Sequence, residues 1–223
     1  LTALTTDAPG TNTLAVDLAT SGAISLGGAT TLSGATRSVT SSASSVSFGG
    51  TLDGASALTV SSVTGTTFGG AVGGTTALTS LSVTGAATLN GGAVTTTGSQ
   101  TYSGSLALGA NATLASTGSG NISLAAVTGA FGLTVNTAGT TAFNGTVSGL
   151  TAITTDSAGT NTLAADLSAS GAIALNGATT LSGASRSVTS TGGAVSFGST
   201  LNGASALTVS SSTGTTFTGA VGG

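Results

Sequence analysis

The sequence has almost no charge. Of its 223 residues, only two are Lys or Arg and five are Asp or Glu, which gives 3% charged residues and a net charge of −3. A typical soluble domain has about 25% charged residues. Two basic residues, Arg37 and Arg186, provide no basic surface for nucleic acid or for an anionic membrane. The composition therefore excludes nucleic acid as an expected partner.

Six other residue types are absent: Cys, His, Lys, Glu, Met and Trp. Without Cys there are no disulfides and no thiolate metal sites. Without His or Lys, no side chain is suited to act as a general base near pH 7. No run approaches the ~18 apolar residues of a membrane span. We therefore expect no membrane insertion, no enzymatic activity, no cofactor, and no catalytic, cofactor-binding or metal-binding residues.

Aromatic residues are also scarce, with six Phe and one Tyr, whereas glycine contributes 38 residues. The mean hydropathy is nevertheless positive. Low charge with positive hydropathy argues against disorder, which needs the opposite combination. The available core residues are Val, Leu, Ile and Ala, so we expect a narrow core and a slender cross-section.

A long internal repeat dominates the sequence. Residues 1–74 align without a gap with residues 150–223, and 57 of these 74 positions are identical. The offset between the two copies, and hence the period, is 149. Residues 1–149 thus form a first long repeat, and 150–223 form the first half of a second copy, continuous with it and not an independent domain. Because the chain begins and ends within a repeat, we expect it to be a segment of a longer tandem array.

A shorter period, of about 20 residues, lies inside the long one. Phe48 and Phe68 belong to two related units, SFGGTLDGASALTV and TFGGAVGGTTALTS, and Phe197 and Phe217 repeat their spacing. Apolar residues that fall on apolar residues at a constant offset are what stacked coils require. The offset of 20 places Leu4 on Ile24, Leu26 on Val46, Leu32 on Leu52, Leu58 on Leu78, and Val127 on Val147. Residues 89–131 break this register, so we expect coils of different length or a bulge there.

Within each unit, short runs alternate between apolar and polar residues. In TLAVDL the residues Leu14, Val16 and Leu18 would lie on one face. A period of two, punctuated by Gly, Asn and Ser, predicts strands of about 4–6 residues joined by tight turns. The predicted fold is all-β: a parallel β-helix, or β-solenoid, with coils of about 20 residues and two or three strands per coil. Roughly eleven coils at ~4.8 Å each would make a rod about 50 Å long.

The charged residues are repeated with the long unit. Asp7 and Asp17 correspond to Asp156 and Asp166, whereas Asp53 becomes Asn202. Arg37 and Arg186 each follow an Asp at the coil offset of 20, which predicts an Arg stacked on Asp17 and on Asp166. Such a pair could bind a ligand, but we favour a surface salt bridge worth about 0–1 kcal/mol. A β-helical polysaccharide enzyme would need clustered carboxylates, and Asp7 and Asp17 lie half a coil apart.

Three kinds of binding motif are poorly matched. Calcium-binding β-rolls need Gly-Gly-x-Gly-x-Asp-x-apolar-x units, which neither FGGTLDGAS nor LNGGAVTTT supplies repeatedly. Gly118-Ser119-Gly120 is interpreted as a turn and not as a phosphate loop, because no helix follows it. Ranks of Thr occur in ice-binding β-helices, but the threonines of Thr11–Thr13, Thr95–Thr97 and Thr64–Phe68 do not recur on one strand of every coil. We therefore expect Thr to serve as a soluble strand former.

The repeats resemble those of very large bacterial surface proteins. Units such as TTFGGAVGGTTALTSLSVTG and GLTVNTAGTTAFNGTVSGLTAITTDSAGT are similar to the Gly/Thr/Ser-rich repeats of filamentous-haemagglutinin-like and autotransporter-type adhesins. The resemblance implies a right-handed parallel β-helix and carries over no site residue. It leads us to expect the structural shaft of an extracellular filament or adhesin at the bacterial cell surface, serving attachment, cell–cell contact or a biofilm matrix. The alternative is a glycan- or ice-binding β-helix module.

The expected partners follow from this interpretation. They are neighbouring repeats, or copies of the chain itself packed end to end or side by side. Other regions of the protein would contact host or cell-surface glycans.

Overall fold

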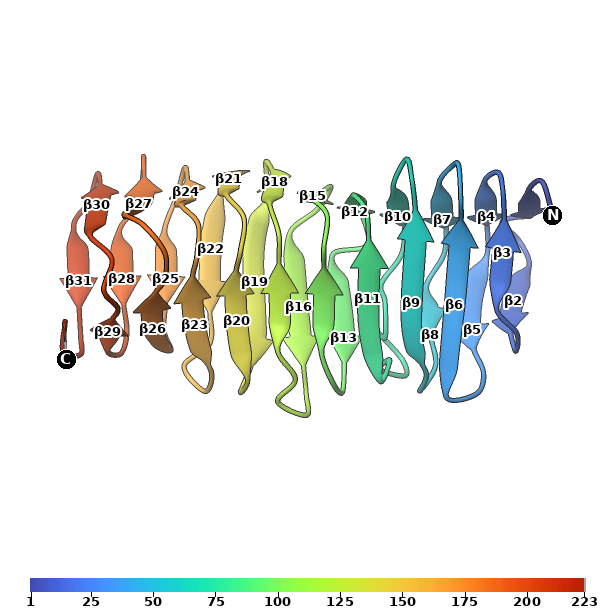
Figure 1. Ribbon diagram of the computed structural model, residues 1–223, viewed down its shortest axis with the longest axis horizontal. Coiled ribbons are helices and arrows are strands. Elements are labelled where there is room, and N and C mark those ends of the chain that lie inside the picture. Colours follow the sequence, from blue (N-terminus) through green and yellow to red (C-terminus); the bar gives the residue numbers. More distant parts are fainter. Residues whose placement is uncertain (223) are drawn as a thin grey trace.

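The structure is a computed structural model that describes residues 1–222. The chain forms a rod with its termini at opposite ends (Figure 1). The described residues contain 31 strands and no helix, and all strand pairs are parallel. The chain winds as a right-handed coil with three strands in most turns, so the rod has three faces (Figure 1). The predicted all-β solenoid is confirmed, with three strands per coil.

Sheet A forms the first face and is unbroken along the rod. It pairs eleven strands in the following order: β1 (Leu4–Thr6), β4 (Ile24–Leu26), β7 (Val46–Phe48), β10 (Thr66–Phe68), β12 (Ala87–Leu89), β15 (Leu106–Leu108), β18 (Val127–Gly129), β21 (Val147–Leu150), β24 (Leu167–Ala169), β27 (Arg186–Ser190) and β30 (Leu207–Ser211).

Sheet B forms the second face in two blocks. The blocks are joined by isolated bridges that link Leu52 to Val72 and Val72 to Val94. The first block contains β2 (Thr11–Leu14), β5 (Ala29–Leu32) and β8 (Leu52–Asp53). The second contains β13 (Ala93–Thr96), β16 (Ala112–Ser116), β19 (Gly132–Thr137), β22 (Ala152–Thr155), β25 (Ile173–Leu175), β28 (Val195–Phe197) and β31 (Thr215–Phe217).

Sheet C closes the third face with ten strands. In order along the rod they are: β3 (Leu18–Thr20), β6 (Thr36–Ser41), β9 (Ala57–Ser62), β11 (Ser80–Thr84), β14 (Gln100–Tyr102), β17 (Ile122–Leu124), β20 (Thr140–Phe143), β23 (Thr160–Leu163), β26 (Ala178–Leu181) and β29 (Leu201–Asn202).

The core is a narrow column enclosed by the three sheets. In a three-residue strand such as β7, Val46 and Phe48 are buried and Ser47 between them faces outward, as the alternation of side chains along a strand requires. Stacking places like on like: the rings of Phe48 and Phe68 are parallel, with centroids 5.6 Å apart. Burial at strand positions one and three therefore sets the register of each coil.

The coil length is more variable than the sequence period indicates. Paired residues are 18 apart at Thr11 and Ala29 and 23 apart at Leu58 and Leu81. The predicted pairs Leu4–Ile24 and Val127–Val147 are confirmed. Three others are wrong: Leu26 pairs with Phe48, Leu52 with Thr30, and Leu81 takes the place predicted for Leu78.

The irregularity is not confined to residues 89–131, where it was expected. Turns of different length occur along the whole rod, and a register shift lies between β21 and β24, next to Val147 and Leu150. The prediction for Val16 is also wrong, because β2 ends at Leu14 and β3 begins at Leu18. Val16 lies in the turn between them and is exposed.

The long repeat does not complete a whole number of turns. In sheet A, β21 lies seven strands after β1, and the sequence equivalent of β1 is β22, one face further on in sheet B. All other equivalent pairs move in the same way: β7 lies in sheet A and β28 in sheet B, whereas β6 lies in sheet C and β27 in sheet A. One 149-residue repeat thus spans seven and one third turns, so the second copy is rotated by one third of a turn.

Candidate functional site: the charged residues and an outward hydroxyl face

The predicted stacking of Arg on Asp does not form. Leu18 pairs with Val39, which places Asp17 beside Ser38 and not beside Arg37. The Asp17 carboxylate accepts the Ser38 backbone N–H at 2.9 Å, and Asp166 accepts that of Ser187 at the same distance. The physical reason is that the pairing offset at this point is 21 instead of 20.

Both arginines bind backbone carbonyls instead. Arg37 Nε donates to Leu14 O at 3.1 Å, and a second guanidinium nitrogen donates to Thr36 O. In the second copy, Arg186 Nε donates to Ser182 O and Nη1 to Ser185 O, each at 2.9 Å. Arg37 thus ties the start of β6 to the end of β2 in the preceding coil, whereas Arg186 binds the corner that precedes its own strand, β27.

The remaining acids also serve turns. Asp53 Oδ1 accepts the backbone N–H groups of Thr75 and Thr76 at 2.8 and 3.1 Å, and Asp156 accepts that of Gly159 at 3.3 Å. Asp7 lies against Gly10 in the corresponding turn of the first copy. No three His, Cys, Asp or Glu side chains gather anywhere in residues 1–222. The described carboxylates are therefore spread along the rod, and Asp17, Asp53, Asp156 and Asp166 each accept a backbone N–H.

The buried polar side chains include a Gln–Tyr pair. Gln100 is fully buried on β14 and donates to Val94 O at 3.3 Å and to Ala115 O at 2.8 Å. The Tyr102 hydroxyl donates to Gln100 Oε1 at 3.2 Å. Burial raises the pKa of the Tyr102 phenol well above its usual value of 10. Across the described residues, every buried side-chain nitrogen or oxygen has a hydrogen-bond partner, so this pair is part of the packing.

Sheet A presents a rank of small hydroxyl side chains to solvent. The outward-facing residue is Ser or Thr in ten of its eleven strands, and Ala in the eleventh. The strand register aligns these residues one above another, apart from the shift at β21–β24. The rank consists of Thr5, Ser25, Ser47, Thr67, Thr88, Ala107, Thr128, Ser148, Ser168, Thr189 and Ser210.

This hydroxyl rank was missed in the sequence. We expected no rank of Thr on one strand of every coil, and threonine alone does not form one in sheet A. Serine and threonine together do, because the variable coil length hides the alignment at a constant offset of 20: Ser25 pairs with Ser47 at an offset of 22, and Thr67 with Thr88 at an offset of 21. The signal that could have found it is the middle residue of each apolar-x-apolar triplet.

The other faces are less uniform. In sheet B the outward column meets Asp53 after Thr13 and Thr31 and is then interrupted where only the bridge at Val72 continues the sheet. In sheet C a second hydroxyl column runs without a register shift through Ser38, Thr59, Ser82, Thr101, Ser123, Thr162 and Thr180, with Ala142 within it and Asn202 at its end. The sheet A column spans more strands of the described chain, and we call it the hydroxyl face.

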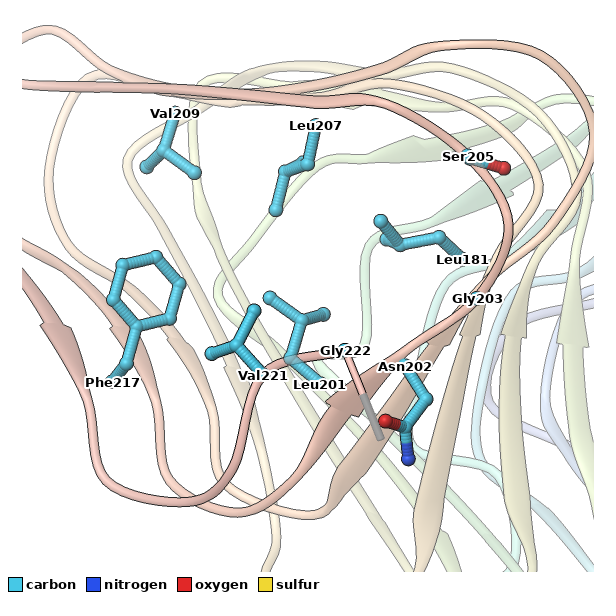
Figure 2. A pocket seen from close by; sticks show the side chains of 10 residues that line it. All are labelled: Leu181, Leu201, Asn202, Gly203, Ser205, Leu207, Val209, Phe217, Val221 and Gly222. Atoms are coloured by element: carbon cyan, nitrogen blue, oxygen red, sulfur yellow. The ribbon is translucent and has the colours of Figure 1, made fainter.

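The two ends of the rod expose core side chains. At the C-terminal end, Val209, Phe217 and Val221 point into a hollow that Leu181 and Leu201 also line (Figure 2). At the N-terminal end, Leu4, Leu14 and Leu18 line a similar hollow. In the first copy, the equivalents of Val209 and Phe217 are Val60 and Phe68, and β11 and β12 cover them. Both hollows are therefore open cross-sections of the core column, and neither contains a charged side chain.

Comparison of the chain with protein-family models, with curated proteins and with solved structures finds no match. Within residues 1–222, no helix long and apolar enough to cross a membrane is found.

Proposed function

We propose that this chain is a structural shaft: a stiff β-solenoid segment of an extracellular bacterial filament or adhesin. Its role is mechanical, holding other parts of the assembly away from the cell surface for attachment, cell–cell contact or biofilm formation. Its partners are neighbouring repeats and further copies of itself, and host or cell-surface glycans are contacted through other regions.

The observation that carries this proposal is the continuous backbone ladder. Sheet A runs through eleven strands without a gap, and each turn of the coil bonds to the turns on both sides. Pulling on the ends of such a rod would have to open whole turns, each held by several parallel hydrogen bonds. The side-chain chemistry agrees with this role, because Asp17, Asp166, Arg37 and Arg186 are all occupied by the chain's own backbone.

Resistance to proteolysis is a second consequence. The only sites for a trypsin-like protease are Arg37 and Arg186, and each lies at the beginning of a strand of the coil, β6 or β27. A protease needs several residues of extended, unpaired backbone, which these strands do not offer. A shaft exposed outside the cell would benefit from both properties.

The second candidate is a glycan- or ice-binding module, and the hydroxyl face is the observation that favours it. A regular rank of hydroxyls could order water or follow the hydroxyls of a polysaccharide. Against it, the rank is one residue wide and mixes Ser, Thr and Ala. No aromatic side chain joins it for stacking on a sugar ring, since Phe48 and Phe68 point into the core.

The decisive experiment is immunogold electron microscopy of intact source cells with an antibody raised against the purified chain. The shaft proposal predicts labelled fibres that project from the cell surface, with label repeating along each fibre. Label confined to the cell interior would contradict it. Ice-recrystallisation and polysaccharide pull-down assays on the purified chain test the second candidate, and for a shaft we expect no activity in either.

A further inference from the structure

We propose that the two ends of the rod bind each other, so that separate copies of the chain join head to tail into a longer shaft. The N-terminal coil of one copy, with β1, β2 and β3, lies on the C-terminal coil of another, with β30, β31 and Val221. This inference rests on the proposed shaft function and deepens it by naming the partner, the two surfaces and their register. The occupant is a second copy, because a junction with nearly the same inward residues already exists inside the chain.

The internal junction lies where the second copy of the long repeat begins. There β22, β23 and β24 pack on β19, β20 and β21 of the preceding coil. The sequence equivalents of β22, β23 and β24 are β1, β2 and β3, which form the N-terminal end of the rod. The internal junction therefore shows which kind of coil the N-terminal strands fit.

The C-terminal coil presents that kind of surface. Residues 133–147 contain six buried side chains. Five of the six are identical in residues 207–221 at a constant offset of 74, and the sixth exchanges Thr137 for Ser211. The identical pairs are Leu133 and Leu207, Val135 and Val209, Thr141 and Thr215, Phe143 and Phe217, and Val147 and Val221.

Both junctions follow the coil in the same order. The internal junction passes through sheets B, C and A, and the two ends would meet through sheets A, B and C. A second copy thus continues each sheet without rotation about the rod. The internal pairs are Leu133–Ile153, Phe143–Leu163 and Val147–Leu167. Transferred to the ends, the same register pairs Leu207 with Leu4, Phe217 with Leu14, and Val221 with Leu18.

The exposure of equivalent residues shows what the contact buries. Phe143 and Val147 are fully buried at the internal junction, whereas Phe217 is 45% and Val221 59% exposed. Both exposed side chains line the hollow at the C-terminal end (Figure 2). Leu18 lines the hollow at the other end. Stacking the two hollows removes these apolar surfaces from water, which is favourable.

The strand edges at the two ends can pair as well. β30 and β31 are the last strands of their sheets, and β1, β2 and β3 are the first strands of theirs. At the internal junction the Ala164 N–H donates to Phe143 O at 2.9 Å, and the corresponding pair at the ends is Ala15 with Phe217. An open edge of this kind is a template for a further strand.

Head-to-tail contact leaves one end of each kind free, so association continues into an open filament. Each copy adds eleven turns, because sheet A contains eleven strands. At ~4.8 Å per turn, the axial repeat of the filament should be ~53 Å.

Two valines provide a matched test. Val221→Asp places a charge where the junction would bury it, which is costly. The control is Val63→Asp, in the turn between β9 and β10. Val63 is 68% exposed, so the two variants change charge and exposed apolar surface alike. Circular dichroism and thermal unfolding would check that both variants are folded.

Sedimentation velocity over a concentration series is the measurement. We expect the parent chain and Val63→Asp to self-associate alike, and Val221→Asp to have a dissociation constant higher by at least about tenfold. No self-association of the parent, or an equal loss in both variants, would overturn the proposal. Neither result would affect the shaft function, because a single rod can serve as a shaft and the immunogold experiment does not depend on joined ends.

Cysteine variants test the register. The chain has no Cys, and the proposed junction places Thr5 of one copy beside Thr208 of the next, both outward-facing. Adjacent strands bring Cα atoms within disulfide range, so a mixture of T5C and T208C should form a disulfide-linked dimer on oxidation. T5C mixed with T216C, on β31 of sheet B, is the control and should not. Equal yields in the two mixtures, or efficient dimerisation of T208C alone, would contradict head-to-tail stacking.

Discussion

Asn12 and its repeat equivalent Asn161 make the same contacts, although Asn12 lies in sheet B and Asn161 in sheet C. Each side-chain amide donates to a glycine carbonyl, Gly28 O at 3.3 Å and Gly177 O at 3.2 Å, and to a threonine hydroxyl on the next strand. Ser41 and Ser190 repeat the pattern at another corner. Local contacts thus follow the local sequence, because the three corners of the coil offer similar surroundings.

The first residue-scale prediction concerns Asp17 and Arg37. Replacing Asp17 by Ala should lower the free energy of unfolding by about 0.5–1.5 kcal/mol, because the Ser38 N–H loses its acceptor. Asp17→Asn keeps an acceptor oxygen and should cost less. In a double-mutant cycle with Arg37→Ala, the coupling energy should be near zero, because each side chain binds the backbone separately. Urea unfolding provides the values, and a coupling of about 1 kcal/mol would instead support an ion pair.

The second residue-scale prediction concerns Tyr102 and high pH. Burial raises the pKa of its phenol in the folded chain, whereas in the unfolded chain it titrates near pH 10. The free energy of unfolding should therefore be unaffected by this group below about pH 10 and should fall above it, because only the unfolded state releases the proton there.

The measurement for Tyr102 has little interference from other residues. The chain has one Tyr, no Trp and no Lys, so phenolate absorbance reports this residue alone. We expect the absorbance to appear together with the loss of β-structure by circular dichroism. Tyr102→Phe should remove this source of pH dependence. Phenolate that forms near pH 10 while the circular dichroism spectrum stays native would show that the phenol is not buried.

At the scale of elements, the corners decide how closely the strands stack. Gly70 follows β10 and lies directly on Gly50 of the preceding turn, so a Cβ at position 70 would lie 2.6 Å from the Gly50 carbonyl carbon. The same contact recurs one turn later, where Gly91 lies on Gly70. Backbone meets backbone at Gly70 with no space for a Cβ, and the second copy keeps glycine there, as Gly219, although Ser199 replaces Gly50 beneath it.

This corner yields a prediction with a control nearby in the sequence. Gly70→Ala should lower the free energy of unfolding by about 1–3 kcal/mol, the usual cost of forcing an extra methyl group into a packed site. Gly74 is exposed and a Cβ there would meet only Ala71 Cβ, at 3.4 Å, so Gly74→Ala should change stability little. Thermal and urea unfolding compare the two variants. Equal effects would mean that the corners have room to adjust.

At the scale of the whole molecule, the 149-residue repeat and the coil are out of step by one third of a turn. Three copies span 22 turns before equivalent residues return to the same face. Any exposed feature of one repeat, such as the turn at Val16, would therefore be presented in three directions by three successive copies. A shaft of this kind has no unique side at the level of its repeat.

The corresponding prediction concerns tandem repeats. A recombinant chain of six 149-residue copies should form one straight rod. Successive copies should be related by a rotation of one third of a turn and an axial rise of ~35 Å, because each copy spans seven and one third turns at ~4.8 Å per turn. Cryo-electron microscopy with helical averaging measures both values. A repeat that returns to the same face in each copy would contradict the observed strand order.

Much of the architecture could be predicted from the sequence. The alternation in triplets such as Val46-Ser47-Phe48 requires short strands with one buried face, and the stacked Phe48 and Phe68 follow from their spacing. The near absence of charge and the short period then leave few folds other than a narrow solenoid. These features are local or periodic, so they do not depend on long-range geometry.

The register of the strands, the face on which each residue lies and the rotation of the long repeat were decided only by the tertiary structure. The pairing partner of a strand depends on how much chain each corner can accommodate, and that length changes from turn to turn, as the offsets of 18 at Thr11 and 23 at Leu58 show. A difference of one residue moved Asp17 from Arg37 to the backbone of Ser38, and a few such differences concealed the hydroxyl face. The rotation of the long repeat has the same cause. The lengths of all the corners within 149 residues add up to a total that is not a whole number of turns, and no single motif encodes that total.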